Sequence, residues 1–192
     1  MPQRRVLPHT LQSSRLVISH YLPEDAAAIN AAVIGALPTL QPWMPWAQAA
    51  PTPAESAQFC ERSFAQFEAG SDYTLKLVLR ETGALIGSSG LHRRLERADA
   101  FEIGYWLHPD YVGQGLISEA VQVIARAAFE HLRASRVEIH AEETNRRSRA
   151  VPERLGWPRT GQRDHINVAG EPTIMVVYTL VAPTAEPSTE DT

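Results

Sequence analysis

The most informative segment of the chain is Phe101-Glu-Ile-Gly-Tyr-Trp-Leu-His-Pro-Asp-Tyr-Val-Gly-Gln-Gly-Leu-Ile-Ser-Glu-Ala120. Its first part reads as a strand, and the glycines after it open a long helix. Glycine lets the backbone turn sharply and approach a ligand closely. The free N–H groups of the helix point at whatever lies in front of them, with the positive end of the helix dipole behind. The turn is therefore expected either to hold a diphosphate or to be a plain strand–helix connection.

Two common nucleotide loops do not fit this turn. A Walker loop needs Gly-Lys-Ser/Thr after the glycines, and none follows. A dinucleotide fingerprint needs a third glycine where Ser118 stands, and no clean βαβ unit precedes it. The turn by itself favours the plain connection, so a function needs a second signal.

The segments around the turn alternate between strand-like and helix-like patterns. Helices are expected to begin at Pro23 and after Thr52, where a capping pattern precedes an apolar face. Apolar residues from Val121 to Leu132 recur with helical spacing. Prolines interrupt residues 37–50, which are expected to form a rigid loop. Strands are expected at 16–22, 73–79, 84–91, 101–107, 136–140 and 173–181, and a further helix at 145–155 that Gly156 ends.

The composition is that of a soluble globular domain: 192 residues, 44% hydrophobic and 21% charged. We expect a flexible arm at 1–13, a single domain at 14–182 and a disordered tail at 183–192. Cys60 is the one cysteine, so no intrachain disulfide can form, and no Cys/His spacing indicates a metal site. The net charge of -4 argues against nucleic acid as a partner. Neither a signal peptide nor a membrane-spanning run is recognisable, so a cytoplasmic setting is expected.

The second signal is a family resemblance. Residues 101–120 resemble the central motif of the GCN5-related N-acetyltransferases (GNAT), in particular the ribosomal-protein N-terminal acetyltransferases of the RimJ/RimL type. The block from Asn145 to Trp157, with Ser148 and Leu-Gly-Trp, resembles a later helix of the same family. Trp46 also suits this branch. The resemblance covers residues 14–181, and it implies an α/β fold of the α+β type, with a mixed and mostly antiparallel central sheet flanked by helices.

The sequence departs from the family pattern at three positions. Val112 and Ile117 stand at the ends of the glycine loop, where the family has other residues. Main-chain N–H groups form the cradle, which is therefore expected to survive. Pro152 lies inside the expected helix after Asn145, where it removes a hydrogen bond and clashes with the preceding turn. That helix is expected either to start later, near Ser148, or to be kinked.

The resemblance implies acetyl-CoA as co-substrate and a set of site residues. Glu102 is the implied base and Ser148 the implied acid near the departing thiolate. Trp43, Trp46, Glu102 and Tyr178 are expected to contact the acceptor. The residues expected to bind acetyl-CoA are Trp106, Leu107, His108, Val112, Gly113, Gln114, Gly115, Leu116, Ile117, Ser118, Asn145, Ser148, Arg149 and Arg154.

Each of these residues has a structural alternative. Strand alternation puts Glu102, Gly104 and Trp106 on one face, where a carboxylate between apolar neighbours would be partly desolvated. Glu102 is thus either a base or a structural glutamate bonded to main chain or an arginine. Asn145 and Ser148 are alternatively helix caps. Core packing is the alternative for Trp43, Trp46 and Tyr178, and solvated helix charges for Arg149 and Arg154. The His108 side chain heads a loop, and its structural reading is preferred.

These residues predict direct acetyl transfer from acetyl-CoA to a primary amine in a ternary complex. The resemblance implies a protein N-terminus of the ribosomal type as acceptor. Acetylation of a small amine, polyamine or drug stays open, as does a non-catalytic acyl-CoA-binding protein. No Ser-His-Asp or Cys-His arrangement supports a covalent acyl-enzyme. The oligomeric state is left open, although homodimers are common in the branch that the chain resembles.

Overall fold

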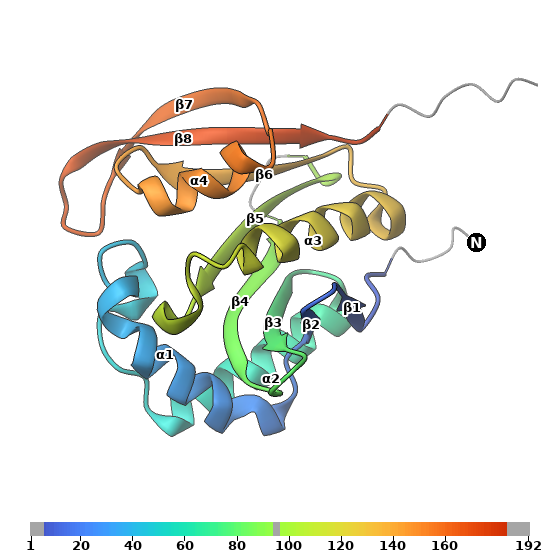
Figure 1. Cartoon of the computed structure of the whole chain (residues 1–192), viewed down its shortest axis with the longest axis vertical. Helices are drawn as coiled ribbons and strands as arrows, with labels where there is room; N and C mark the ends of the chain where they lie inside the picture. Colours follow the sequence, from blue (N-terminus) through green and yellow to red (C-terminus); the bar gives the residue numbers. More distant parts are fainter. Residues whose placement is uncertain (1–5, 94–96, 184–192) are drawn as a thin grey trace, which may run out of the picture.

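A computed structural model describes residues 6–93 and 97–183, which form one eight-stranded sheet in the order β1-β2-β3-β4-β5-β6-β8-β7 (Figure 1). All neighbouring strands are antiparallel except β5 and β6, which are parallel. The expected mixed, mostly antiparallel sheet is therefore confirmed. The strands are β1 (Thr10–Gln12), β2 (Leu16–His20), β3 (Tyr73–Leu79), β4 (Leu85–His92), β5 (Ala100–Leu107), β6 (Arg136–Glu142), β7 (Arg159–Ile166) and β8 (Pro172–Val181).

Helices cover both faces of the sheet. The helices are α1 (Ala26–Leu40), α2 (Pro53–Ala69), α3 (Leu116–Leu132) and α4 (Arg146–Arg154), with short 3-10 turns η1 (Pro23–Asp25), η2 (Pro45–Ala47) and η3 (Pro109–Tyr111). The apolar face of α3 packs on Phe101 and Ile103 of β5 in the main core. A second apolar cluster joins α1 and α2, and Trp106 packs against it. Alternate residues of β5 thus face different helix layers.

The start of α2 confirms the capping pattern read from the sequence. The Thr52 hydroxyl accepts a hydrogen bond from the Glu55 N–H at 3.2 Å, and the Glu55 carboxylate accepts one from the Thr52 N–H at 2.7 Å. The helix ends where Gly70 adopts a left-handed conformation with φ +67°. Both ends of α2 therefore follow from local sequence chemistry.

Two expectations about loops are wrong. Residues 37–40 continue α1, because Pro38 lies in its last turn, where a missing N–H costs a single hydrogen bond. Residues 6–13 do not form the expected arm: Thr10–Gln12 pairs with β2 as β1, and Leu7 is buried. The rest of the expected arm and almost all of the expected tail, residues 1–5 and 184–192, lie outside the described residues.

Strand β7 is absent from the sequence-based expectation. Seven of its eight residues are exposed, and it borders only β8, at the edge of the sheet. A strand exposed in this way needs no apolar alternation, and alternation is the signal by which strands are recognised. Its pairing with β8 defines it instead.

The feature that positions the site is the separation of β5 from β6. Their parallel pairing covers only Ala100–Glu102 against Arg136–Glu138. Strand β5 then continues to Leu107 and β6 to Glu142, and Figure 1 shows the two strands diverging beneath α4. Beyond Glu102 and Glu138, the facing edges of β5 and β6 are therefore not paired with each other, although both strands lie in the middle of the sheet.

Candidate active site

The glycine turn leads directly into an uncapped helix. Gly113 and Gly115 have φ values of +81° and +76°, which are left-handed conformations that glycine adopts without strain. Helix α3 begins at Leu116, and its N-cap, Gly115, has no side chain to bond the first N–H groups. A Cβ built on Gly113 meets nothing within 4 Å, so the space in front of the turn is open. This geometry suits the expected anion cradle, whose donors would be main-chain N–H groups.

A carboxylate that the sequence analysis did not pair with any partner holds this turn in place. Glu119, in the first turn of α3, accepts hydrogen bonds from the Arg15 N–H at 2.8 Å and the Ser14 hydroxyl at 2.9 Å, and it pairs with the Arg15 guanidinium at 2.7 Å. Arg15 also donates to the Gln114 carbonyl at 2.9 Å. Burial opposes ionisation of Glu119, but hydrogen bonds from Ser13, Arg15 and Ser14 outweigh it and lower its pKa to about 2. The segment before β2 is thus fastened to the turn.

Helix α4 starts earlier than the proline indicated. Asn145 is its N-cap and accepts a hydrogen bond from the Ser148 N–H at 3.1 Å, so the helix begins at Arg146 and not near Ser148. Pro152 lies in the second half of the helix, with its side chain buried. The Asn145 amide oxygen, expected to contact the cofactor, is used as a cap here.

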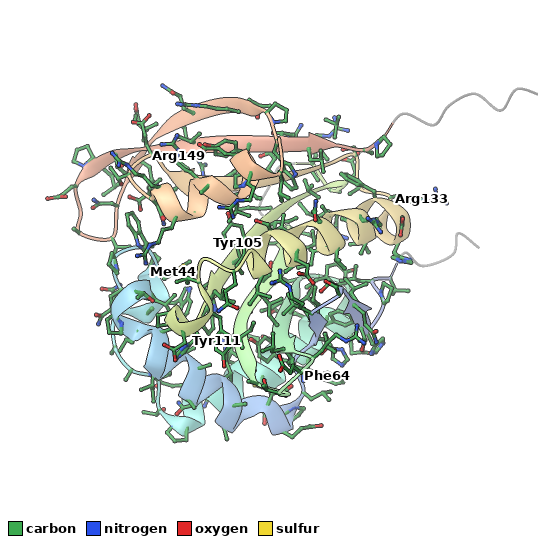
Figure 2. All side chains as sticks on the ribbon, in the orientation of Figure 1. Met44, Phe64, Tyr105, Tyr111, Arg133 and Arg149 are labelled. Atoms are coloured by element: carbon green, nitrogen blue, oxygen red, sulfur yellow. The ribbon has the colours of Figure 1, made fainter. Side chains whose placement is uncertain are left out.

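Tyr105 joins β5 to α4 and is not among the site residues expected from the sequence. Its hydroxyl donates to the Ser148 carbonyl at 2.7 Å and lies 3.4 Å from the Ser148 hydroxyl. Burial raises the pKa of Tyr105, so the phenol stays protonated at neutral pH. Figure 2 shows Tyr105 near the centre of the molecule, close to α3. Strand alternation could have placed Tyr105 on the face of α3 and α4, but not its bond to Ser148.

Arg149 and Tyr178 form a closed group with Glu153. Arg149 donates to the Tyr178 hydroxyl at 3.1 Å and pairs with Glu153 at 3.0 Å, and Tyr178 donates to Glu153 at 2.6 Å. Tyr178 stands opposite Ile139 in the β6–β8 register, on the face that packs under α3 and α4. Glu102 lies on the other face, as its contact with His140 shows. Tyr178 and Glu102 are therefore not brought together.

The remaining arginine of the expected cofactor set, Arg154, is exposed at the end of α4. The Arg149 guanidinium donates hydrogen bonds to the Tyr178 hydroxyl, the Glu153 carboxylate and the Glu143 carbonyl. In this structure Arg149 links α4 to β8. The burial of Tyr178 supports a role in core packing.

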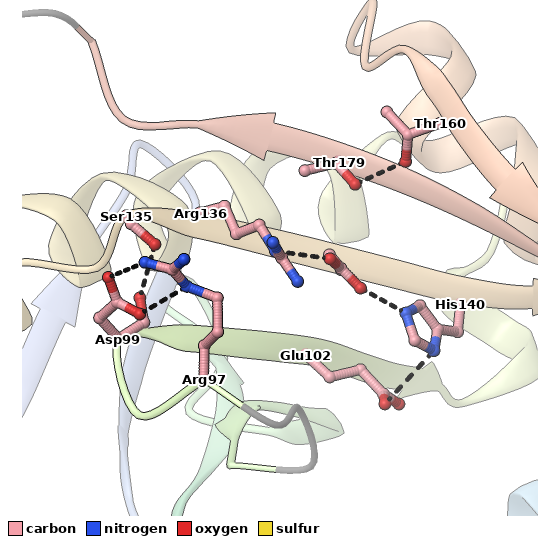
Figure 3. A network of polar contacts seen from close by, with 9 residues as sticks. Arg97, Asp99, Glu102, Ser135, Arg136, His140, Thr160 and Thr179 are labelled. Atoms are coloured by element: carbon pink, nitrogen blue, oxygen red, sulfur yellow. Dashed lines mark hydrogen bonds and ion pairs between the residues drawn. The ribbon is translucent and has the colours of Figure 1, made fainter.

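Glu102 lies in a row of polar side chains on the face opposite α3. Its carboxylate is 3.6 Å from Nδ1 of His140, whose Nε2 is 2.8 Å from the Glu138 carboxylate (Figure 3). Glu138 also pairs with Arg136 at 2.7 Å. The Glu102 and His140 side chains are only 16% and 9% exposed, which keeps the charges close in a poorly solvated place.

Tryptophans border the same face. The rings of Trp46 and Trp106 lie 6.4 Å apart, and Trp46 is 54% exposed. Trp106, expected to contact the cofactor, shares its strand face with Glu102, and Trp43 is half-buried near η2. The structure thus places Trp46 and Trp106 on the face that carries Glu102.

The end of β5 offers one backbone donor toward the strand separation. The His108 N–H donates to the Ile86 carbonyl of β4 at 2.8 Å and is occupied there. Successive N–H groups of a strand point to opposite edges, so the Leu107 N–H points to the edge released from β6. The His108 ring lies against Gly35 of α1, where an added Cβ would come within 2.4 Å of its Nε2, which agrees with a structural role for this side chain.

Glu102 thus stands where the pairing of β5 with β6 ends, and further along β5 Tyr105 contacts Ser148 in the first turn of α4. Val112, Gly113 and Gln114 are exposed at the mouth of the cradle, Ile117 is half-buried, and the Ser118 side chain is buried. Among residues 6–93 and 97–183, no group of three or more His, Cys, Asp or Glu side chains is arranged to hold a metal ion. Within the same residues, no helix is both long and apolar enough to cross a membrane.

This combination of sheet, glycine turn and strand separation matches a known family. Residues 15–157 match the model of the acetyltransferase (GNAT) domain, and the chain belongs to that family. It is 39% identical over 100 residues to the Bacillus subtilis protein named "Putative ribosomal N-acetyltransferase YdaF". That match covers 52% of this chain and 55% of the relative, so the chain spans about half the length of the curated relative.

Solved structures support the same fold over nearly the whole chain. A crystal structure described as "Probable acetyltransferase" is 27% identical with a TM-score of 0.82, covering 90% of this chain and 96% of the other. The structure of RimL, a ribosomal L7/L12 alpha-N-protein acetyltransferase in complex with coenzyme A, has a TM-score of 0.81 at 18% identity, covering 92% of this chain and 98% of the other. At that identity the second likeness concerns the fold alone.

Proposed function

We propose that this protein transfers an acetyl group from acetyl-CoA directly to a primary amine. The observation that carries the proposal is the separation of β5 from β6 beyond Glu102, between the uncapped end of α3 and the face that holds Glu102. The thioester of acetyl-CoA would lie along the unpaired edge of β5, and the amine would reach it in the space between β5 and β6. Family membership supports the same reaction.

The glycine turn would hold the diphosphate of coenzyme A. Gly113 and Gly115 leave room for it, and the N–H groups of Leu116 to Ser118 are donors without a capping side chain. Charge on the ligand is thereby met by oriented backbone dipoles. Of the two arginines expected to bind acetyl-CoA, Arg154 is exposed and could contact the adenosine phosphates. Arg149 is hydrogen-bonded inside the fold.

The chemical step would use Glu102, Leu107 and Ser148. Glu102 takes a proton from the ammonium group, and the free amine attacks the thioester carbon. The Leu107 N–H stabilises the tetrahedral oxyanion at the released strand edge. As the C–S bond breaks, the thiolate receives the second amine proton, with Ser148 and the Tyr105 phenol as the nearby donors.

A protein N-terminus is the proposed acceptor, because the names of YdaF and RimL point to ribosomal proteins. Small amines are the rival acceptors. A panel of peptides with free N-terminal serine or alanine, tested against spermidine and free amino acids at equal concentration, separates the two. We expect the highest kcat/KM with a peptide. A higher kcat/KM with a small amine would show that small amines are the acceptors.

A further inference from the structure

The feature that the proposed function leaves unused is the imidazole of His140. It lies between two carboxylates on neighbouring strands: Nδ1 is 3.6 Å from Glu102 and Nε2 is 2.8 Å from Glu138. The ring is 9% exposed, and Figure 3 shows it bridging the gap between β5 and β6. A histidine held in this way connects the proposed base to a second buried acid.

The hydrogen-bond partners define the tautomer of His140. An ionised carboxylate only accepts, so the short contact with Glu138 requires a proton on Nε2. A guanidinium only donates, and Arg163 Nη2 lies 3.4 Å from Nδ1, which therefore accepts. The unprotonated nitrogen of His140 is therefore Nδ1, and it is the ring nitrogen that lies 3.6 Å from the Glu102 carboxylate.

We propose that His140 is a positioning and proton-relay residue for Glu102, oriented by Glu138. The inference rests on the proposed acetyl transfer. Glu102 removes one proton from the ammonium group. Nδ1 of His140 then takes that proton from Glu102, so Glu102 becomes a carboxylate again. The resulting imidazolium, with Nε2–H on Glu138, loses the proton to solvent between turnovers. The second amine proton goes to the coenzyme A thiolate, so the overall step releases one proton.

Other charged groups bear on this site from every packed element. Arg136 on β6 pairs with Glu138, and Arg163 on β7 reaches Nδ1. His92 on β4 stands opposite Glu102 in the register and pairs with Asp72 at 3.0 Å. Strand β8 contributes no ionisable side chain opposite His140, because Val177 is its partner there.

Another carboxylate on the same strand shows why Glu138 is the partner. Burial raises the pKa of Glu142, and His165 counteracts it only in part. Nε2 of His140 forms its hydrogen bond with Glu138, at 2.8 Å. The relay is therefore a chain from Glu102 through His140 to Glu138, anchored by Arg136.

The experiment compares His140→Gln with wild type on the full chain, using acetyl-CoA with an N-terminal serine peptide and with spermidine. The relay predicts that kcat with the better acceptor falls about tenfold or more, with KM for acetyl-CoA unchanged. It also predicts that kcat of the variant rises more steeply with pH than that of wild type, because hydroxide and buffer then replace the relay. His131→Gln, the same substitution at an exposed position in the last turn of α3, is the matched control and should change neither quantity.

A double-mutant cycle separates the relay from the proposed function. In the Glu102→Gln background, His140→Gln should cause no further loss, since the proton no longer passes through Glu102. Unchanged kcat in Glu102→Gln overturns Glu102 as the base and the relay with it, whereas the absence of amine-stimulated thiol release from wild type overturns the proposed function. A loss in Glu102→Gln combined with wild-type kcat and pH profile in His140→Gln overturns the relay alone.

A measurement without turnover covers the case in which neither acceptor reacts. The imidazole ¹⁵N signals of His140 should change towards the other tautomer in Glu138→Gln, because an amide can donate as well as accept and so no longer requires a proton on Nε2. Identical His140 signals in wild type and Glu138→Gln overturn the relay. Circular dichroism on each variant shows that the fold is retained, so a collapsed variant is not mistaken for a lost relay.

Discussion

Glu102 derives its chemical character from where β5 stops pairing with β6. The last paired residues of the two strands are Glu102 and Glu138, so Glu102 stands at the inner corner of the separation. It is close to solvent-accessible space and still only 16% exposed. A carboxylate in that position can meet an incoming amine and pass its proton along buried groups.

The substitution Glu102→Gln removes the proton acceptor and keeps the shape of the side chain. We expect kcat to fall by about 10²-fold or more, which is the usual contribution of a positioned base. Acetyl-CoA affinity should be unchanged, because the cradle is built elsewhere. Thiol release measures kcat, and calorimetric titration measures the affinity for acetyl-CoA. An unchanged kcat would show that Glu102 is a structural residue and not the base.

Tyr178 lies in the core, and we expect that it does not contact the acceptor. Its hydroxyl is bonded to Arg149 and Glu153 on the face opposite Glu102. Tyr178→Phe should lower the free energy of unfolding by about 1–2 kcal/mol through loss of these bonds. The KM for the amine should stay within twofold of wild type. A large rise in that KM, with stability unchanged, would restore Tyr178 to the acceptor site.

At the scale of elements, the glycine turn and α3 act as one unit. Gly113→Asp places a negative charge and a side chain in the open space before the uncapped helix, at φ +81°. We expect the Kd for acetyl-CoA to rise at least tenfold. Gly170→Asp is the matched control, since Gly170 has φ +82° and equally open surroundings in the turn between β7 and β8.

Both substitutions carry a similar backbone strain of about 1–2 kcal/mol. The difference in Kd between the two variants therefore measures the charge and bulk in front of α3. Equal acetyl-CoA affinity in Gly113→Asp and wild type, measured by calorimetry, would rule out the turn as the diphosphate site.

The elements differ in how far the sequence predicts them. The cap at Thr52, the glycines before α3 and the six apolar strands follow from local chemistry, and all are present. Strand β7 has no buried face to mark it, and Pro38 has no sequence sign that it falls in a last turn. The pairing of His140 with Glu102 and Glu138, and of Arg15 with Glu119, depends on which strands become neighbours. That information is not local, so the sequence identified Glu102 but not its partners.

At the scale of the whole molecule, Glu119 connects the N-terminal side of the sheet to the cradle. Its folded pKa of about 2 lies below the ordinary value of 4.5, so the ionised form stabilises the fold. That stabilisation is fully present above about pH 4.5 and is lost as the pH falls towards 2. The fold should therefore lose stability in this acid range as Glu119 takes up its proton.

Glu119→Gln tests this connection. At pH 7 we expect the free energy of unfolding to fall by about 1–3 kcal/mol, because the charge-assisted bonds to Arg15 are lost. The difference from wild type should shrink as the pH is lowered from 4.5 towards 2, where the wild-type carboxyl is also neutral. Urea titrations at several pH values check the trend, and a difference that is constant across this range would contradict it.

Acetyl transfer, and not only acyl-CoA binding, is the activity that we propose for this GNAT-family chain. The most direct measurement is the release of free coenzyme A thiol from acetyl-CoA as the amine concentration is raised, with the acetylated amine identified by mass spectrometry. We expect thiol release that saturates with the amine and matches the acetylated product one for one. Acetyl-CoA binding without amine-stimulated thiol release, across peptides and small amines, would contradict it.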